Sequence, residues 1–496
     1  MEDQGVQFAS VDGRRSSQHA GKAILADAVR AVDADVAGRI EKTQDWRKHY
    51  ITSFTDTVVA GATSAKNASR VAVDGLNSLH DHLSFVRDGK DLRLDHAFSE
   101  AGEAVFDTEV IEGTGARATE LQVPYKGALL SGDELVRQLV AWERAGVIEA
   151  SARTALERVI ANPDWLDLSD RYFALLGASS EMGPLSSLCA WGANVLAVDL
   201  PRRHLWEHIS TLAYAGSGRV FAPVRGSGTD VVQRAGVDLI TDAPAVGTWL
   251  KTFDQAFTIG NYVYADGTNF VRLATAVDAL IAHLLGTRPD LSVAYLATPT
   301  DVFAVPEEVV DGARANATRS LIAGPLRALS GSKLYARNYD DLVPGEDGRR
   351  WGISDSLVPI QGPNYALAKS LQRWRAVVSR EDGFVTSANV APASNTASVT
   401  KNKMLAAAYR GAPSFGIEIF DPATTRTLMA ALLVHDLRDP SAAANPATEL
   451  SHPFDLFVQG AIHGGIWRLP YEARSILPIG LVGGFLKRRP PARTGF

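Results

Sequence analysis

The chain of 496 residues carries 50 Lys and Arg against 56 Asp and Glu, a formal net charge of −6. Hydrophobic residues make up 46% and charged residues 21%, as in ordinary globular proteins, and the length predicts two or three structural regions. The negative charge argues against nucleic acid as the main partner. A single cysteine, Cys189, excludes an internal disulfide and a multi-cysteine zinc site. Residues 1–17 are polar, unlike a secretory signal, so we expect a cytoplasmic protein.

One apolar segment, residues 476–486, lies near the C-terminus and is followed by Lys487, Arg488 and Arg489. It is too short to span a bilayer. An apolar segment that ends in cations can rest on a membrane surface. Such a segment is more often a buried helix or loop with a solvated end, and that is the interpretation we favour.

Residues 1–165 are predicted to be mainly helical, because apolar residues recur there at three- and four-residue spacing. Ser131 and Asp133 stand where the N-cap of one of these helices is expected. The predicted helices are residues 29–40, 130–145 and 148–160.

The same region contains His80 and His82, which could be read as a pair of metal ligands. No third ligand follows at a suitable spacing, so solvated surface histidines are the better interpretation and no metal site is predicted.

From Asp170 onward, short apolar runs alternate with helical patterns, as in an α/β protein with a parallel sheet. A helix is expected at residues 269–285 and another from Asn364 onward. We predict a doubly wound parallel-sheet core of the Rossmann type. Its strands are expected at residues 172–176, 194–198, 237–240, 291–296 and 384–390.

Three regions follow from these patterns. Residues 1–165 form the helical N-terminal region, and residues 166–437 form the dinucleotide-binding and catalytic domain. Residues 302–362, rich in Gly, Pro and charged clusters, interrupt that domain as an insertion over the active-site mouth. Residues 438–496 are expected to complete the core and the substrate pocket, beginning with a surface connection at 438–450.

Two glycines mark a nucleotide turn. Gly177 directly follows the first strand, and Gly183 comes six residues later. A chain that turns sharply and brings a helix N-terminus to a pyrophosphate requires small residues at this point. Ala178, Ser179 and Ser180 fit that requirement, and the two serines can hydrogen-bond phosphate or ribose.

The second strand ends on Asp199, 22 residues after Gly177. A carboxylate at this place can accept both hydroxyls of an adenosine ribose, and it repels a 2′-phosphate. The sequence therefore favours NAD(H) over NADP(H). The nearby Arg202 and Arg203 leave NADP(H) open.

Tyr365 and Lys369 lie four residues apart, so on a helix their side chains share one face. A free phenol has a pKa near 10 and is a poor base at neutral pH. A neighbouring ammonium stabilises the phenolate and lowers that pKa. The pair predicts a phenol that acts as acid or base beside the nucleotide pocket.

In these motifs the chain resembles the short-chain dehydrogenase/reductase family, whose first turn usually reads Thr-Gly-x-x-x-Gly-x-Gly. Leu176 replaces the Thr, and Glu181 replaces the middle glycine. A carboxylate there should repel a pyrophosphate unless its side chain turns outward or pairs with a cation. The matching residues are Gly177, Ala178, Ser179, Ser180 and Gly183.

Further resemblances follow in family order. They imply that the neighbourhood of Asp238 contacts adenine and that Asn269 anchors a water that relays the proton. Residues 264–267 only loosely echo the family's Asn-Asn-Ala-Gly turn. The implied roles of Tyr365 and Lys369 are general acid/base and support of the phenolate and nicotinamide ribose. The implied cofactor site comprises Gly177, Ser179, Ser180, Met182, Gly183, Asp199 and Asp238, with Pro392 and Thr396 at the nicotinamide.

The family also places a serine before the tyrosine to hydrogen-bond the substrate oxygen. The hydroxyls available here are those of Thr298 and Thr300, and of Ser354 and Ser356 within the insertion. The sequence does not decide among them, nor between a cavity-lining and a core role for Trp351, Trp467, Leu469 and Tyr471.

The resemblance implies an NAD(P)(H)-dependent oxidoreductase that interconverts a hydroxyl and a carbonyl on a small-molecule substrate, including a bulky apolar one. An epimerase or dehydratase that holds NAD tightly is an alternative. A non-catalytic nucleotide-binding or interaction protein is another. A homo-oligomer through the helices that carry Asn269 and Tyr365 is left open.

Overall fold

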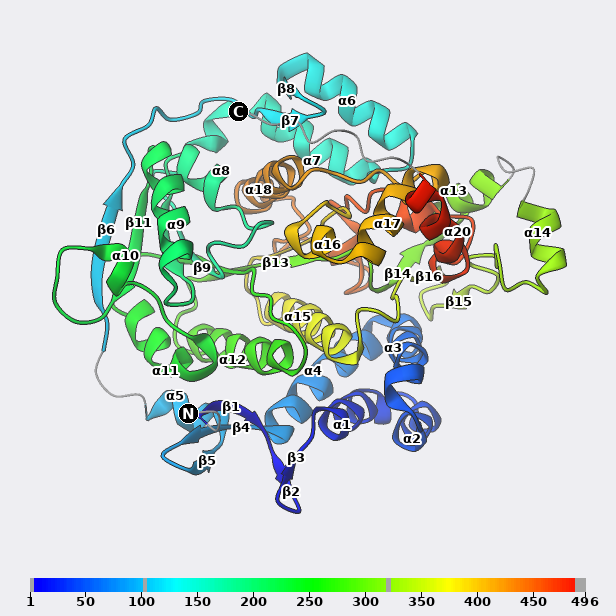
Figure 1. Ribbon diagram of the computed structural model, residues 1–496, viewed down its shortest axis with the longest axis horizontal. Helices are drawn as coiled ribbons and strands as arrows, with labels where there is room; N and C mark the ends of the chain where they lie inside the picture. Colours follow the sequence, from blue (N-terminus) through cyan, green and yellow to red (C-terminus); the bar gives the residue numbers. More distant parts are fainter. Residues whose placement is uncertain (1–3, 101–104, 318–322, 487–496) are drawn as a thin grey trace.

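The computed structural model describes residues 4–100, 105–317 and 323–486. At its centre lies a seven-stranded, mostly parallel sheet with helices packed on both faces (Figure 1), so the chain is an α/β protein with a Rossmann-like fold. From one edge to the other, the strands are β17 (Thr386–Val390), β13 (Ser292–Ala297), β12 (Phe257–Asn261), β9 (Tyr172–Leu176), β10 (Asn194–Val198), β11 (Arg219–Val224) and β6 (Asp107–Glu112).

The order of the strands reverses at the middle of the sheet. From β9 the chain adds β10 and β11 on one side, and then β12, β13 and β17 on the other, all of them parallel. Sheets with this order bind ligands at the point of reversal, outside the carboxyl ends of the strands. In this chain that point lies between β9 and β12.

Four of the five predicted strands are confirmed. β9 and β10 have the predicted bounds, and β13 and β17 lie within two residues of theirs. Every residue of β10 and of β17 is buried. Residues on both sides of these strands are buried because helices cover both faces of a parallel sheet. β10 is largely apolar, whereas Ser387 and Asn389 of β17 are satisfied by hydrogen bonds to Asp436.

The strand predicted at residues 237–240 is wrong. Asp238 instead caps helix α11 (Leu239–Leu250), since its carboxylate accepts a hydrogen bond from the Ile240 amide at 3.0 Å. The third parallel strand is β11, where Pro223 obscures the pattern. This proline is tolerated because it lies beyond Phe221, the last residue that pairs with β10. β12 was absent from the prediction as well.

A layer of helices packs on each face of the sheet (Figure 1). The predicted helices at 130–145, 148–160, 269–285 and from Asn364 onward are confirmed as α6, α7, α12 and α15. On one face lie α6 (Gly132–Arg144), α7 (Ala150–Ala161), α8 (Leu185–Ala190), α9 (Arg203–Ala215) and α18 (Pro422–Arg438); on the other lie α11, α12 (Thr268–Leu285) and α15 (Pro363–Glu381).

The N-terminal helices form a further layer against α12 and α15. The single helix predicted at residues 29–40 is wrong, because α1 ends at Arg30 and α2 begins at Ala34. The Asp33 carboxylate accepts a hydrogen bond from the Val36 amide at 2.9 Å and so starts a new helix. This layer contains α1 (Ser17–Arg30), α2 (Ala34–Lys42), α3 (Trp46–Ala62) and α4 (Ala65–His82).

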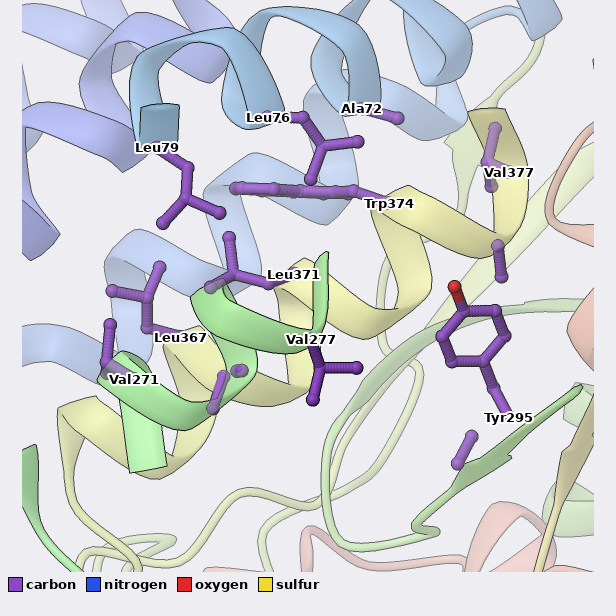
Figure 2. Close-up of a cluster of buried hydrophobic side chains, with 14 of the residues drawn as sticks. Ala72, Leu76, Leu79, Val271, Val277, Tyr295, Leu367, Leu371, Trp374 and Val377 are labelled. Atoms are coloured by element: carbon purple, nitrogen blue, oxygen red, sulfur yellow. The ribbon is translucent and has the colours of Figure 1, made fainter. Parts of the chain in front are cut away.

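Trp374 joins this layer to the sheet domain. Figure 2 shows its indole ring between α4 and α15, with Leu76 on one side and Leu371 on the other. A Cβ atom on Gly75 would lie only 2.4 Å from the ring, so the tryptophan requires a glycine on α4. The N-terminal helices therefore share one hydrophobic core with the sheet.

The region predicted as helical also contains strands. β6 pairs antiparallel with β11 and closes one edge of the central sheet. The others form small sheets and hairpins: β1 (Gly5–Phe8), β4 (Leu83–Arg87) and β5 (Lys90–Leu92); β2 (Ser10–Val11) and β3 (Arg14–Arg15); β7 (Val123–Tyr125) and β8 (Ala128–Leu130), with α5 (Leu94–Ser99) after β5.

The predicted insertion has structure of its own. A small antiparallel sheet is built from β14 (Val302–Pro306), β16 (Arg350–Asp355) and β15 (Val343–Pro344). Helices α13 (Glu307–Ala317) and α14 (Ala323–Leu329) lie between its strands in the chain. Residues 356–362 lead from this sheet directly into α15.

After β17 the chain forms α16 (Ala397–Lys401) and α17 (Lys403–Gly411). The last described helix is α20 (Ala473–Leu486), which packs on α17. Of the helix or loop expected at 476–486, the structure has the helix, as part of α20, but only one side of it is buried. Residues 439–450 form neither helix nor strand, as expected, and of the predicted connection only Arg438 belongs to α18.

Within the described residues, one helix has the length and apolar composition to cross a membrane. This helix is α12, and 67% of it is buried inside the fold. It packs between α11 and α15 as a core helix.

Candidate nucleotide-binding and active site

A large cavity opens at the carboxyl ends of β9, β12 and β13, beside the N-terminus of α15. Its volume is about 1340 Å³, which exceeds the roughly 300–1,000 Å³ typical of a site for one small ligand. The cavity therefore has room for a dinucleotide and a second molecule. The predicted site residues that line it are Gly177, Ser179, Ser180, Met182, Asp199, Thr298, Thr300, Ser356, Tyr365, Lys369, Pro392 and Thr396.

The turn after β9 depends on Gly177. Its φ of +80° lies in a region that side-chain-bearing residues rarely adopt. A Cβ atom there would lie 3.0 Å from the carbonyl oxygen of Tyr262. The Gly177 amide donates to the Val198 carbonyl at 2.9 Å, so the turn folds back over the end of β10. This path leaves the two following serines on the cavity wall.

Asp199 holds the turn in place. One carboxylate oxygen accepts a hydrogen bond from the Ser179 amide at 2.7 Å, and the other accepts from the Leu200 amide at 2.8 Å. Each carboxylate oxygen has a further lone pair, so Asp199 can still accept a hydroxyl from inside the cavity.

Glu181 points to the segment that follows β17. Its Oε2 accepts a hydrogen bond from the Ala397 amide at 2.8 Å, at the N-terminus of α16, where negative charge is favourable. Its backbone carbonyl accepts from Arg426 at 2.9 Å. The Glu181 carboxylate thus links the turn after β9 to α16. This hydrogen bond holds the side chain toward α16 and not toward the place of a pyrophosphate.

Tyr365 begins a row of hydroxyl groups. It is half-buried at the start of α15, and its hydroxyl is hydrogen-bonded to the side chain of Thr298. The Oγ1 atoms of Thr298 and Thr300 lie 3.0 Å apart, and Thr300 accepts a hydrogen bond from Gln361 at 3.1 Å. Both threonines follow β13, so the strand end and the start of α15 together arrange this row.

Burial raises the pKa of Tyr365 above that of a free phenol, and the nearby Asp301 carboxylate raises it further. The hydrogen bond from Thr298 acts in the opposite direction. The expectation that Lys369 lowers the pKa of this phenol is therefore not met by the groups of the chain itself.

Lys369 lies one turn along α15 from Tyr365. Its ammonium donates to the Leu296 carbonyl at 3.4 Å and to Gln372 at 3.1 Å, and it lies 6.0 Å from the centre of the Phe270 ring. Burial lowers the pKa of Lys369 to about 8, while Asp301 opposes this shift. Lys369 can therefore gain or lose a proton close to neutral pH.

The sequence analysis missed Asn261, which ends β12 at the reversal point of the sheet. Only 4% of this residue is exposed, and it lines the cavity. An apolar strand that ends in one polar residue, as β10 ends before Asp199, would have indicated it. The segment 264–267 lies farther along the cavity wall, with the Tyr264 ring 6.5 Å from that of Tyr365.

Four predicted site residues do not line the cavity. Asn269 is exposed and its Oδ1 accepts a hydrogen bond from Arg272, whereas Asp238 caps α11. Ser354 is completely buried away from the cavity. Gly183 lies behind the turn, where its amide donates to the Ser180 carbonyl at 2.9 Å.

The far end of the cavity is apolar. Leu469 lies on this wall, as one reading of the sequence expected. Trp351, Trp467 and Tyr471 instead belong to the hydrophobic core. The apolar wall comes mainly from α17, α20 and the segments next to them: Val399, Leu405, Tyr409, Phe415, Ile417, Ile419, Leu469, Ile476 and Leu477.

The expectation of solvated surface histidines is wrong for His80. This side chain is partly buried and lies 2.7 Å from Asp278, which also receives two hydrogen bonds from Arg375. His82 bonds to Ser78 within its own helix. Arg375 and His80 hold the pKa of Asp278 well below its usual range. The group joins α4, α12 and α15.

A second buried ionic group lies behind the cavity. The Glu149 carboxylate contacts His463 at 2.8 Å and receives a hydrogen bond from Arg468 at 2.7 Å. His463 and then Arg468 lower the pKa of Glu149 to about 2, against the opposing effect of burial. The group joins the start of α7 to the C-terminal region.

Comparison of the chain with models of known protein families, with curated proteins and with solved structures finds no match in any of the three.

Proposed function

We propose that the protein is an NAD(P)(H)-dependent oxidoreductase with a doubly wound core of the short-chain dehydrogenase/reductase type. The observation that carries the proposal is the convergence of Gly177, Asp199, Tyr365 and Lys369 on one cavity at the reversal point of the sheet. The first two come from the ends of β9 and β10, and the last two from α15, which follows a long insertion. The nucleotide turn and the Tyr/Lys pair are far apart in the sequence, and their meeting in one cavity supports the proposal.

The residues present fit a nicotinamide dinucleotide. Gly177 lets the turn after β9 pass close to the Tyr262 backbone, where a Cβ atom would collide, and so keeps the turn at the cavity. Asp199 offers carboxylate oxygens to a ribose, which favours NAD(H) and leaves NADP(H) as the less favoured cofactor. Pro392 and Thr396, which follow β17, line the same cavity.

The cofactor supplies or accepts a hydride. Tyr365 gives or takes the proton at the substrate oxygen, and its raised pKa keeps the phenol in the protonated form that carbonyl reduction requires. Thr298, hydrogen-bonded to Tyr365, takes the place of the family serine, and Thr300 and Gln361 extend the row. Lys369, which lines the same cavity, would hold the ribose hydroxyls of a bound nucleotide.

The substrate is an alcohol or ketone with a bulky apolar part. The apolar end of the cavity, between Tyr365 and the helices α17 and α20, accommodates that part. We place this activity in the cytoplasm.

The first test is a fluorescence titration of the purified protein with NADH and with NADPH. We expect tighter binding of NADH, weakened at least tenfold in Asp199→Ala. Asp238→Ala is the matched control, because that carboxylate lies outside the cavity and should leave binding unchanged. Failure of either nucleotide to bind at millimolar concentration would overturn the proposal.

Turnover is tested with a panel of long-chain alcohols and ketones. Tyr365→Phe should lower kcat by about 10²- to 10⁴-fold, because it removes the proton that the phenol transfers. The affinity for NADH should remain within about twofold. Tyr214→Phe, on the exposed side of α9 and outside the cavity, is the control and should retain activity.

A second candidate is a nucleotide-binding protein without catalysis. The raised pKa of Tyr365 favours it, because a phenol that stays protonated at neutral pH cannot act as the general base that alcohol oxidation requires. It predicts tight NADH binding with no turnover of any member of the panel.

A further inference from the structure

We propose that the outer face of helices α17 and α20 docks the protein on an anionic lipid membrane. This inference concerns a surface rather than the cavity chemistry, and it does not depend on nucleotide binding. The two helices lie side by side next to α16 at one side of the molecule (Figure 1).

The outer side of α20 carries a stripe of exposed apolar side chains. Pro478, Val482 and Phe485 recur at helical spacing and are exposed, Val482 and Phe485 at 61% each. Leu486 at the end of the helix is 78% exposed, and Met404 on α17 is 54% exposed. Large apolar groups gathered on packed helices indicate a contact surface.

The packing of the two helices keeps these groups outside. A Cβ atom on Gly484 would lie 1.8 Å from the carbonyl oxygen of Ala407, and one on Gly411 would lie 2.0 Å from that of Gly480. Because small residues bring the backbones this close, no space remains between the helices for larger side chains. Ile476 on the inner side of α20 instead lines the cavity.

The charge of these segments has one sign. Residues 383–417 and 473–496 contain no Asp or Glu, in a chain whose net charge is −6. Arg474 is neutralised by Asp355, but Lys401 and Lys403 beside the apolar stripe are exposed. The sequence after α20 continues with further cations, namely Lys487, Arg488, Arg489 and Arg493.

An apolar stripe flanked by cations matches a helix that lies in the membrane interface, where anionic headgroups attract the cations. A second copy of the chain fits less well. In a symmetric dimer the same patch would face itself and bring the cations of both subunits together without an acidic partner on these segments.

The position of the helices adds a functional reason. Their inner sides, including Leu405 and Leu477, line the apolar end of the cavity. A bilayer on the outer side would lie about one helix diameter, roughly 10 Å, from that end. Apolar molecules dissolved in the bilayer would thus be concentrated next to the cavity.

The test is co-sedimentation of the full chain, without nucleotide, with vesicles of phosphatidylcholine alone or with about one third phosphatidylglycerol. We expect binding to the anionic vesicles that weakens in about 0.5 M NaCl, since salt screens the attraction. Val482→Ser with Phe485→Ser should lower the partition coefficient at least tenfold. Lys401→Gln with Lys403→Gln should lower it about tenfold on anionic vesicles only.

The matched control is Val110→Ser with Leu129→Ser, which changes two side chains of similar exposure on β6 and β8. It should bind like the original protein, and circular dichroism should show all variants folded. Absence of binding at low salt, or an equal loss in the control, would overturn the proposal. A dimer in ultracentrifugation that the α20 variant dissociates, without vesicle binding, would also overturn it and assign the face to a second copy.

Discussion

Burial of the Lys369 ammonium in the cavity wall opposes folding. Its pKa of about 8 lies below the 10.5 of an exposed lysine because burial disfavours the ammonium. Below pH 8 both the folded and the unfolded chain bind the proton, and the folded chain bears the full cost of the buried charge. Between pH 8 and 10.5 the folded chain has lost its proton, so this cost declines as pH rises.

Lys369→Met should therefore stabilise the protein. We expect its free energy of unfolding at pH 7 to exceed that of the original chain by about 1–3 kcal/mol, and the gap to narrow at pH 9.5. Urea unfolding at the two pH values measures both quantities. The exposed Lys66 on α4 provides the control variant, Lys66→Met, which should show no such gap. A less stable Lys369→Met would show that the ammonium contributes more through its hydrogen bonds than burial costs.

Ionisation of Glu149 stabilises the folded chain, whereas ionisation of Lys369 destabilises it. Its pKa of about 2 lies below the ordinary 4.5, so the stability it contributes is present above pH 4.5 and is lost as pH falls toward 2. Glu149→Gln leaves the partly buried Arg468 without its counter-charge and should lower the free energy of unfolding by about 3 kcal/mol at pH 7.

Urea unfolding at pH 7, 5 and 3 measures the difference between Glu149→Gln and the original chain. The difference should be constant from pH 7 to 5 and smaller at pH 3. The exposed Glu120 supplies the control, Glu120→Gln, with little effect at any of these pH values. A difference that grows toward pH 3 would contradict the assignment.

At this scale the sequence predicted which residue types meet, but not how they are oriented. Gly177, Asp199, Tyr365 and Lys369 lie in one cavity because each stands at a strand end or on a helix face that spacing alone defines. Asn269 was misplaced because its side chain turns outward to Arg272, one turn along the same helix. Arg272 is in turn held by the Val6 carbonyl of the distant strand β1, a contact that depends on tertiary structure. The choice of Thr298 as partner of Tyr365 depends on the path of the insertion, which no local pattern encodes.

Among the elements, the pair α17 and α20 depends on glycine in a way that can be tested one position at a time. A Cβ atom on Gly484 would meet the Ala407 carbonyl oxygen, whereas nothing lies within 4 Å of one on Gly483. Gly484→Ala must therefore push the helices apart, while Gly483→Ala only favours the helical backbone.

Hydrogen exchange of the α20 amides measures this difference. We expect at least tenfold faster exchange in Gly484→Ala and unchanged or slower exchange in Gly483→Ala. Faster exchange in both variants would mean that any added side chain disturbs this end of the chain, and would contradict the packing argument.

The elements that the sequence predicted correctly are those with a single strong periodicity. β9 and β10 are continuous apolar runs, and α12 is a long apolar helix. The errors arose where one polar residue changes the outcome. Asp33 divides a helix in two, and Asp238 starts a helix where an apolar run suggested a strand.

For the whole molecule, the layered core predicts that the N-terminal helices and the sheet domain unfold together. Residues of α1, α3 and α4 belong to the same hydrophobic cluster as α12, α15 and the sheet. Composition distinguished the N-terminal region from the rest, but the insertion of Trp374 against Gly75 could not be predicted from either segment alone.

Leu76→Ala on α4 tests this cooperativity. Leu76 is 4% exposed and packs against Trp374, so its truncation should cost about 2–5 kcal/mol. Because the core is shared, calorimetry should show one transition, shifted as a whole to lower temperature. Val73→Ala on the same helix is the control, since Val73 is 39% exposed and should leave the melting temperature nearly unchanged. A separate early transition in Leu76→Ala, with the main transition at its original temperature, would show that the N-terminal helices form an independent unit.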